Sequence, residues 1–158
     1  MKFKTFSGQD TMDMASCLGK MLRDGDTVLL HGDLGAGKSV FARGVARGLG
    51  ITGAMPSPTF TLLIPYTQGG RRLYHYDLYR LNDEDEFFAA GLDEFIGGDG
   101  VALVEWPEMA SLDVTPRLDV TIDRTPSGDE NERVIEITNM GVIGFDPAAL
   151  AKWSAEGK

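Results

Sequence analysis

The sequence predicts a three-layer α/β fold around a central sheet that mixes parallel and antiparallel strands. The apolar run TVLLH at 27–31 leads directly into a glycine-rich loop, and a helical repeat of Phe41, Val45 and Leu49 follows. The segments TLLIPY and RLYHYDLY are predicted to be strands, and the short TQGG connection forces them into an antiparallel hairpin. VALVEW at 101–106 predicts a further buried strand. Buried strands interleaved with an amphipathic helix are typical of a layered α/β domain.

The N-terminal segment adds an edge strand and a helix to this scheme. Residues 2–6 are suited to a short strand at the edge of the sheet. Helical spacing follows, and the segment RDGD is expected to end that helix. The apolar positions of the helix are Met14, Leu18, Met21 and Leu22.

The second half of the chain predicts one more helix, a hairpin and a short terminal helix. NDEDEFFAAGL at 82–92 reads as a helix, with Asn82 or Asp83 as its N-cap and acidic residues in its first turn. LDVTID and VIEIT alternate apolar and polar residues, which predicts a peripheral hairpin with one solvated face from about residue 117. Asp146 followed by proline is typical of the start of a last short helix.

Size and charge limit the classes of function. The chain has 158 residues, so we expect residues 1–158 to form a single domain. It carries 24 acidic and 15 basic residues, a net charge of −9 that makes a nucleic acid a poor direct partner. Cys17 is the sole cysteine, which excludes an intrachain disulfide and suits a reducing compartment. No signal peptide or apolar run of membrane-spanning length is recognisable, so we expect a cytoplasmic protein without a membrane partner.

The segment HGDLGAGKSVFARG has the spacing of a phosphate-binding loop. Glycines let the backbone wrap around an anion so that amide N–H groups point at phosphate oxygens, and the following helix adds its positive end. Lys38 would neutralise the β- and γ-phosphates, and the Ser39 hydroxyl would complete the shell of a Mg²⁺ ion. The alternative is a glycine-rich turn that only caps a helix, but the flanking strand and helix favour nucleotide binding. The predicted nucleotide-binding loop residues are Gly32, Asp33, Leu34, Gly35, Ala36, Gly37, Lys38 and Ser39.

Two acids are candidates for holding Mg²⁺ or a water molecule beside the phosphates. Glu105 directly follows the apolar run VALV, the usual place for such an acid at the end of a strand. Asp77 lies two residues after His75, so in a regular strand both face the same way and would orient a water or carry a proton. Each residue also has a purely structural alternative. Glu105 would be a solvated strand end, Asp77 would form a salt bridge to Arg80, and His75 would pack in the core.

The segment SPTF lies in the proline-containing loop 51–60, between the loop helix and the next strand. The hydroxyls of Ser57, Thr59 and Thr61 are placed to sense a γ-phosphate, or else to brace their own backbone. Trp106, beside Glu105, is more often a core or partner contact than a ligand contact. The chain has no Asn-Lys-x-Asp motif, which argues against a GTPase, and no obvious arginine- and aspartate-rich lid, which weakens the case for a small-molecule kinase.

Four segments, GDLGAGKS, SPTFTL, YHYDLYR and VEWPE, occur in this order and closely resemble the TsaE (formerly YjeE) family from residue 10 to about 125. The resemblance implies a P-loop ATPase with a mixed sheet, needed to make threonylcarbamoyladenosine next to the tRNA anticodon. Such a subunit binds ATP and Mg²⁺ and joins TsaB-like and TsaD-like subunits. The TsaD-like subunit is the transferase, the ATPase resets the complex between turnovers, and tRNA is met only through the complex.

The resemblance also implies roles for individual residues. Lys38 and the loop amides would hold phosphates, and Ser39, where many relatives have threonine, would hold Mg²⁺ together with Glu105. Asp77 would be needed for hydrolysis. Trp106, Thr11 and Arg133 match positions beside the nucleotide. Two alternatives stay open: a phosphotransferase acting on a small acceptor, and a nucleotide-gated interaction module with negligible hydrolysis.

Overall fold

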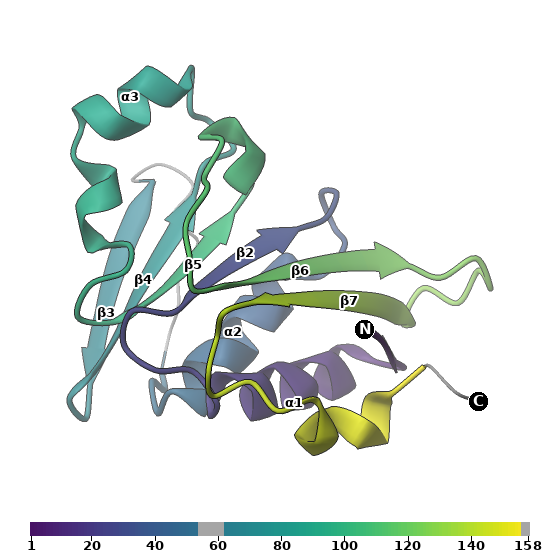
Figure 1. Cartoon of the computed structure of the whole chain (residues 1–158). Coiled ribbons are helices and arrows are strands. Elements are labelled where there is room, and N and C mark those ends of the chain that lie inside the picture. Colours follow the sequence, from purple (N-terminus) through teal and green to yellow (C-terminus); the bar gives the residue numbers. More distant parts are fainter. Residues whose placement is uncertain (54–61, 156–158) are drawn as a thin grey trace.

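The computed structural model describes residues 1–53 and 62–155, and within these ranges seven strands form one sheet. Their order across the sheet is β1-β7-β6-β2-β5-β4-β3 (Figure 1). The strands are β1 (Lys2–Thr5), β2 (Thr27–His31), β3 (Leu63–Gln68), β4 (Arg71–Asp77), β5 (Val101–Glu105), β6 (Arg117–Arg124) and β7 (Arg133–Met140).

The sheet is mixed, as the sequence predicts. At its centre, β2 runs parallel to both β5 and β6, and β5 runs parallel to β4. The pairs β3–β4, β6–β7 and β1–β7 are antiparallel. All five residues of β5 are buried, as expected for a strand covered on both faces, and β1 forms an edge of the sheet as predicted.

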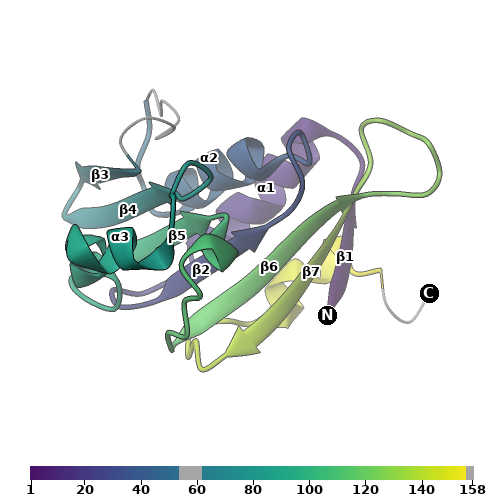
Figure 2. The same ribbon diagram turned by 90° about the horizontal axis from the view of Figure 1, so that it is seen from above.

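Helices cover the two faces unequally and give the predicted three layers. The helices α1 (Gly8–Gly19) and α2 (Lys38–Gly48) lie side by side on one face (Figures 1 and 2). The opposite face near β4 and β5 carries α3 (Glu84–Ala89) and two short 3₁₀ segments, η1 (Leu92–Phe95) and η2 (Pro107–Met109). A third 3₁₀ segment, η3 (Pro147–Trp153), packs beside α1 and is the short terminal helix expected after Asp146.

Two predicted helices end earlier than expected. The first stops at Gly19, because the amides of Met21 and Leu22 bond to carbonyls three residues back, so the last two apolar positions lie beyond it. The second begins with Asp83 as N-cap, one of the two candidates, and ends at Ala89. Gly91 then adopts a left-handed conformation with φ of 71° and separates α3 from η1.

The C-terminal hairpin, expected at the periphery, lies nearer the centre of the sheet. Strand β6 pairs directly with β2, with Val28 opposite Leu118, and β7 separates β6 from the edge strand β1. The alternation was nevertheless informative, since β6 alternates buried and more exposed positions along most of its length. Among the described residues, none of the helices is both long enough and apolar enough to cross a membrane.

Candidate functional site

A cavity of about 400 Å³ opens where the parallel strands β4 and β5 end beside the loop that follows β2. Crevices at the carboxyl ends of parallel strands are the usual ligand sites of α/β sheets. The cavity collects most of the residues that the sequence indicates. Those lining it are Leu34, Gly35, Gly37, Lys38, Ser39, Val40, Asp77, Tyr79, Arg80, Glu105 and Trp106.

The loop after β2 is shaped by close backbone packing. Gly32 has φ of 153°, and a Cβ there would lie 2.8 Å from the carbonyl oxygen of Ile122, so the position has no room for a side chain. Gly37 is the N-cap of α2 and provides no side chain to cap its amides. The first amides of α2 therefore remain available for an anion, as the phosphate-binding prediction requires.

Lys38 is buried at the N-terminus of α2 without a hydrogen-bond partner among the described residues. Lys38 is only 6% exposed, and its Nζ lies 3.4 Å from the ring centroid of Trp106. Burial lowers the pKa of Lys38, and the negative charges of Glu105 and Asp77 partly oppose this change. A buried ammonium group that lacks a hydrogen-bond acceptor fits the oxygens of a phosphate.

The two candidate acids lie side by side, because Asp77 of β4 is the register partner of Glu105 of β5. Glu105 is buried, whereas Asp77 is partly exposed and its Oδ1 accepts the amide of Tyr79 at 3.0 Å. Burial raises the pKa of Asp77, the hydrogen bond from Tyr79 counteracts this, and the charge of Glu105 raises the pKa further. The carboxylates thus differ in solvent contact and in hydrogen bonding.

The partner of His75 differs from the one that strand alternation indicates. His75 and Asp77 do belong to one regular strand, but Nε2 of His75 lies 2.7 Å from Oε2 of Glu105. Nδ1 of the same ring is buried and has no hydrogen-bond partner among the described residues. Sequence alternation alone shows which residues share a strand face. It does not show the register with the next strand, which decides this contact.

Two arginines of the β6–β7 hairpin hold the glycine loop by its carbonyl groups. Arg124 donates from Nη2 to the carbonyl of Gly35 at 3.1 Å, and Arg133 donates from Nε to the carbonyl of Ala36 at 2.7 Å. Arg133 was expected beside the nucleotide, and the structure shows it bonded to the loop itself. Arg124 was not singled out, since nothing in its local sequence marks it as a partner of a loop 89 residues away.

Thr11 lines a smaller hollow of about 150 Å³ that adjoins the main cavity, since Gly37 and Val40 border both. Its hydroxyl lies 2.6 Å from that of Thr5, so it already has one hydrogen-bond partner. Arg133 lines the same hollow. The structure therefore brings Thr11 and Arg133 together beside the loop, and their contact with a nucleotide stays a prediction.

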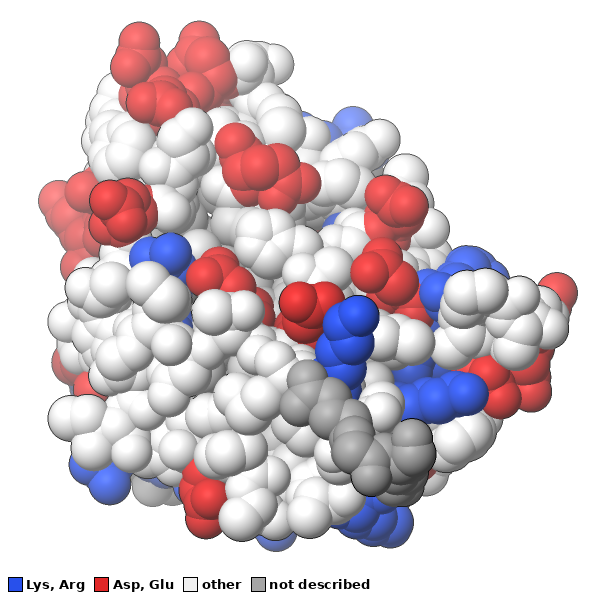
Figure 3. Space-filling view, turned by 45° about the vertical axis from the view of Figure 1, so that its right-hand side comes forward, with Lys and Arg blue, Asp and Glu red and all other residues white. Residues whose placement is uncertain are grey.

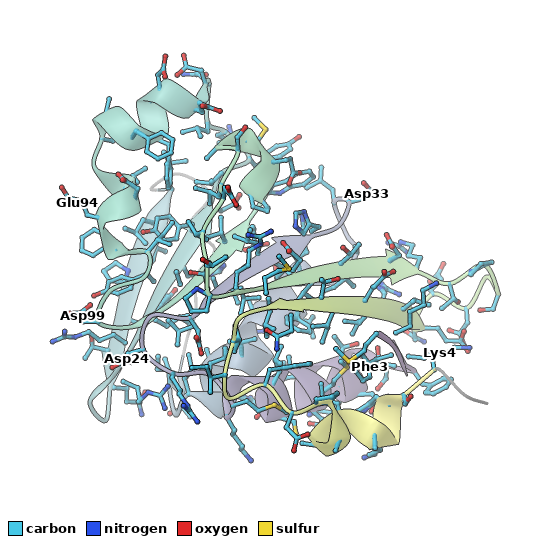
Figure 4. All side chains as sticks on the ribbon, viewed as in Figure 1. Phe3, Lys4, Asp24, Asp33, Glu94 and Asp99 are labelled. Carbon is cyan, nitrogen blue, oxygen red and sulfur yellow. The ribbon has the colours of Figure 1, made fainter. Side chains whose placement is uncertain are left out.

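Asp33, one of the predicted binding residues, does not line the main cavity. Asp33 is exposed at the tip of the loop after β2 (Figure 4) and lines a separate hollow with Ala36 and Arg124. Thr59, like the other hydroxyl candidates of its loop, lies outside the described residues.

The site offers few protein ligands to a metal ion. Ser39 and Glu105 line the cavity together, and no group of three His, Cys, Asp or Glu side chains suited to a metal occurs among the residues described. Mg²⁺ is commonly held by one or two protein oxygens together with phosphate oxygens and water. The donors present fit that kind of site.

A family model described as "Threonylcarbamoyl adenosine biosynthesis protein TsaE" matches residues 5–135. The chain belongs to the TsaE family. A protein of Bacillus subtilis strain 168, named tRNA threonylcarbamoyladenosine biosynthesis protein TsaE, is 42% identical over 142 residues, which are 89% of this chain and 87% of that protein. A protein of the same name from Treponema pallidum is 40% identical over 134 residues, 85% of this chain and 98% of its own length.

The fold is shared as well. The crystal structure of Bacillus subtilis YdiB superposes with a TM-score of 0.73 at 37% sequence identity, covering 89% of this chain and 86% of that one. The TsaE family model includes every residue that lines the main cavity, and it ends before η3. The cavity therefore lies within the part of the chain that this family shares.

Proposed function

We propose that this TsaE-family chain binds ATP with Mg²⁺ in the main cavity and hydrolyses it as an accessory ATPase of tRNA threonylcarbamoyladenosine biosynthesis. One observation carries the proposal above all. The buried ammonium of Lys38 lies at the uncapped N-terminus of α2, has no hydrogen-bond partner among the described residues, and shares a cavity with two carboxylates. A polyphosphate with its counter-ion satisfies the charge and hydrogen-bonding requirements of all these groups.

Each residue has a distinct task in this proposal. Lys38 and the first amides of α2 hold the β- and γ-phosphate oxygens. Ser39 and Glu105 hold Mg²⁺, which when bound supplies positive charge next to the transferred phosphoryl group. Asp77, whose pKa is raised mainly by burial, accepts a proton from the attacking water and orients it.

We assign the adenine and ribose to the region of the smaller hollow, which adjoins the glycine loop. Thr11 and Arg133 border this hollow, with Gly37 shared between the two spaces. Arg133 stabilises the loop through the Ala36 carbonyl, so its contribution to nucleotide binding combines contact with support.

The acidic character of the chain supports an accessory role. With a net charge of −9 it repels a polyanion, so we propose that tRNA is reached only through TsaB-like and TsaD-like partner subunits in the cytoplasm. In this scheme the partners carry out the transfer to adenosine. Turnover of ATP in the cavity resets the complex.

Calorimetric titration with ATP, with and without Mg²⁺, tests the nucleotide part of this proposal. We expect Lys38→Ala to weaken ATP binding, Glu105→Ala to remove the effect of Mg²⁺, and Asp77→Ala to keep binding while hydrolysis falls. Hydrolysis that is unchanged in Asp77→Ala contradicts the role assigned to that residue.

Co-purification with TsaB-like and TsaD-like proteins tests the partner part. A chain that neither binds Mg²⁺·ATP nor co-purifies with these partners contradicts the proposal as a whole. ATP consumption that requires a small metabolite, and not the partners, would instead indicate a phosphotransferase.

A further inference from the structure

The side chain of His75 has one polar contact among the described residues, and that contact is Glu105. Nε2 lies 2.7 Å from Oε2 of the carboxylate, whereas Nδ1 is buried without a hydrogen-bond partner. Both residues are more than nine-tenths buried, with 4% and 6% of their surface exposed. No other described polar group accounts for the orientation of the imidazole, so the two side chains depend on each other.

The strand register explains why His75 reaches Glu105. His75 is the partner of Leu103, and Asp77 is the partner of Glu105, so His75 lies diagonally across from the carboxylate on the same face of the sheet. Asp77 is the direct register neighbour of Glu105, so two carboxylate groups lie side by side and repel each other when both are charged. A hydrogen bond to one oxygen of Glu105 opposes displacement of that carboxylate.

Lys38 provides a second reason to restrain Glu105. Among the negative charges that oppose the lowering of the Lys38 pKa, Glu105 is the strongest, yet Nζ of Lys38 has no hydrogen-bond partner in the described part of the chain. A Glu105 side chain that turned towards Lys38 would form an ion pair. In that ion pair Lys38 would no longer be available to bind phosphate, and Glu105 would no longer be available to bind the metal.

We propose that His75 is a positioning residue, which holds Oε2 of Glu105 and so leaves its second oxygen for Mg²⁺ and Lys38 for phosphate. This inference rests on the proposed function, in which Glu105 holds the metal. Partners of a metal-holding side chain fix its orientation, and their loss typically weakens metal binding about 10- to 100-fold. In this role His75 acts through Glu105 and does not contact the nucleotide.

The test compares the affinity for ATP with and without Mg²⁺ in the full chain by calorimetry. His75→Leu removes the hydrogen bond, so we expect the gain in ATP affinity that Mg²⁺ provides to fall about tenfold or more. His75→Gln retains an N–H donor at similar reach and should restore most of that gain. Failure of His75→Gln to recover it, when His75→Leu has lost it, contradicts positioning through the hydrogen bond.

Two further variants separate positioning from simple stability. Leu73→Val removes buried volume on the same strand, so it should lower the melting temperature while the Mg²⁺ effect stays at the wild-type value. In a Glu105→Gln background, His75→Leu should cause no further loss of the Mg²⁺ effect. A Mg²⁺ effect that survives His75→Leu overturns this inference alone. Wild-type binding that ignores Mg²⁺ overturns the inference together with the proposed function.

Discussion

The ammonium group of Lys38 is buried next to the ring of Trp106 and has no hydrogen-bond partner among the described residues. Such a group destabilises the ligand-free fold, because the aromatic face and the nearby carboxylate charges replace only part of its lost hydration. We predict that Lys38→Met raises the free energy of unfolding by about 1 kcal/mol while ATP binding is lost. Denaturant unfolding and calorimetry measure the two effects. Lys20→Met, at an exposed lysine, is the control, and a less stable Lys38→Met protein contradicts this account.

Asp99 provides a prediction for acid stability. The hydroxyl of Tyr74 donates to it at 2.6 Å, and this bond is the largest cause of a pKa below the ordinary 3.8. Because the folded pKa is lowered, Asp99 contributes stability above pH 3.8, and the contribution disappears as pH falls through the lowered pKa. Tyr74→Phe should therefore destabilise the protein at neutral pH and by progressively less in acid.

NMR titration of the Asp99 carboxyl measures this effect directly. In Tyr74→Phe the pKa of Asp99 should rise towards its ordinary value, whereas Tyr79→Phe, at an exposed tyrosine, should leave it unchanged. If the pKa of Asp99 is the same in Tyr74→Phe and in the wild type, the Tyr74 hydroxyl is not the main cause of the lowered pKa.

At the residue scale, the sequence predicted the groups of the site better than their contacts. Lys38, Asp77 and Glu105 were indicated by spacing and by position at strand ends, and all three line one cavity. The pairing of His75 with Glu105 was not predictable, since it depends on the register between two strands that are distant in sequence. Local alternation shows which residues share a face, and only the assembled sheet shows which of them meet.

Among the elements, the β6–β7 hairpin supports the glycine loop that follows β2. Arg124 bonds to the Gly35 carbonyl and Arg133 to the Ala36 carbonyl, and these bonds restrain the loop directly before the first amides of α2. We predict that Arg124→Ala weakens ATP binding about fivefold, the effect of one hydrogen bond worth about 1 kcal/mol. Calorimetry measures the affinity for ATP, and Arg43→Ala, at an exposed position of α2, is the control variant. Equal affinities in both variants would contradict the supporting role.

The packing of α1 against α2 depends on glycine at the contact. A Cβ at Gly48 would lie 2.2 Å from the carbonyl oxygen of Ser16, so the two backbones approach too closely for a side chain. We predict that Gly48→Ala lowers the free energy of unfolding by about 1–3 kcal/mol, although alanine favours a helix. Gly8→Ala in α1, where nothing lies within 4 Å, should be neutral or stabilising. Similar unfolding midpoints for the two variants would contradict this packing.

The sequence predicted the type of each element more securely than its ends. Strands β2 and β5 were visible as continuous apolar runs, because they are covered on both faces. The ends of α1 and α3 were not predictable from apolar spacing. After α1 the backbone changes to bonds that reach three residues back, and after α3 Gly91 adopts a left-handed conformation. The place of β6 beside β2 was also missed, because alternation describes a solvated face and says nothing of the neighbour.

At the scale of the whole molecule, acidic side chains are spread over the face that Figure 3 shows and gather at the end formed by α3. This distribution, with a net charge of −9, makes a polyanion such as tRNA a poor direct partner, as the proposed function requires. It also explains why one lysine at the head of α2 matters, since Lys38 shares its cavity with two carboxylates.

The rate of ATP hydrolysis, measured for the chain alone and with TsaB-like and TsaD-like subunits, tests the central claim most directly. We predict Mg²⁺-dependent turnover that is slow alone, rises with both partners present, and falls in Asp77→Ala without loss of the complex. Absence of turnover in every mixture, or turnover that follows a small acceptor and ignores the partners, would contradict the account.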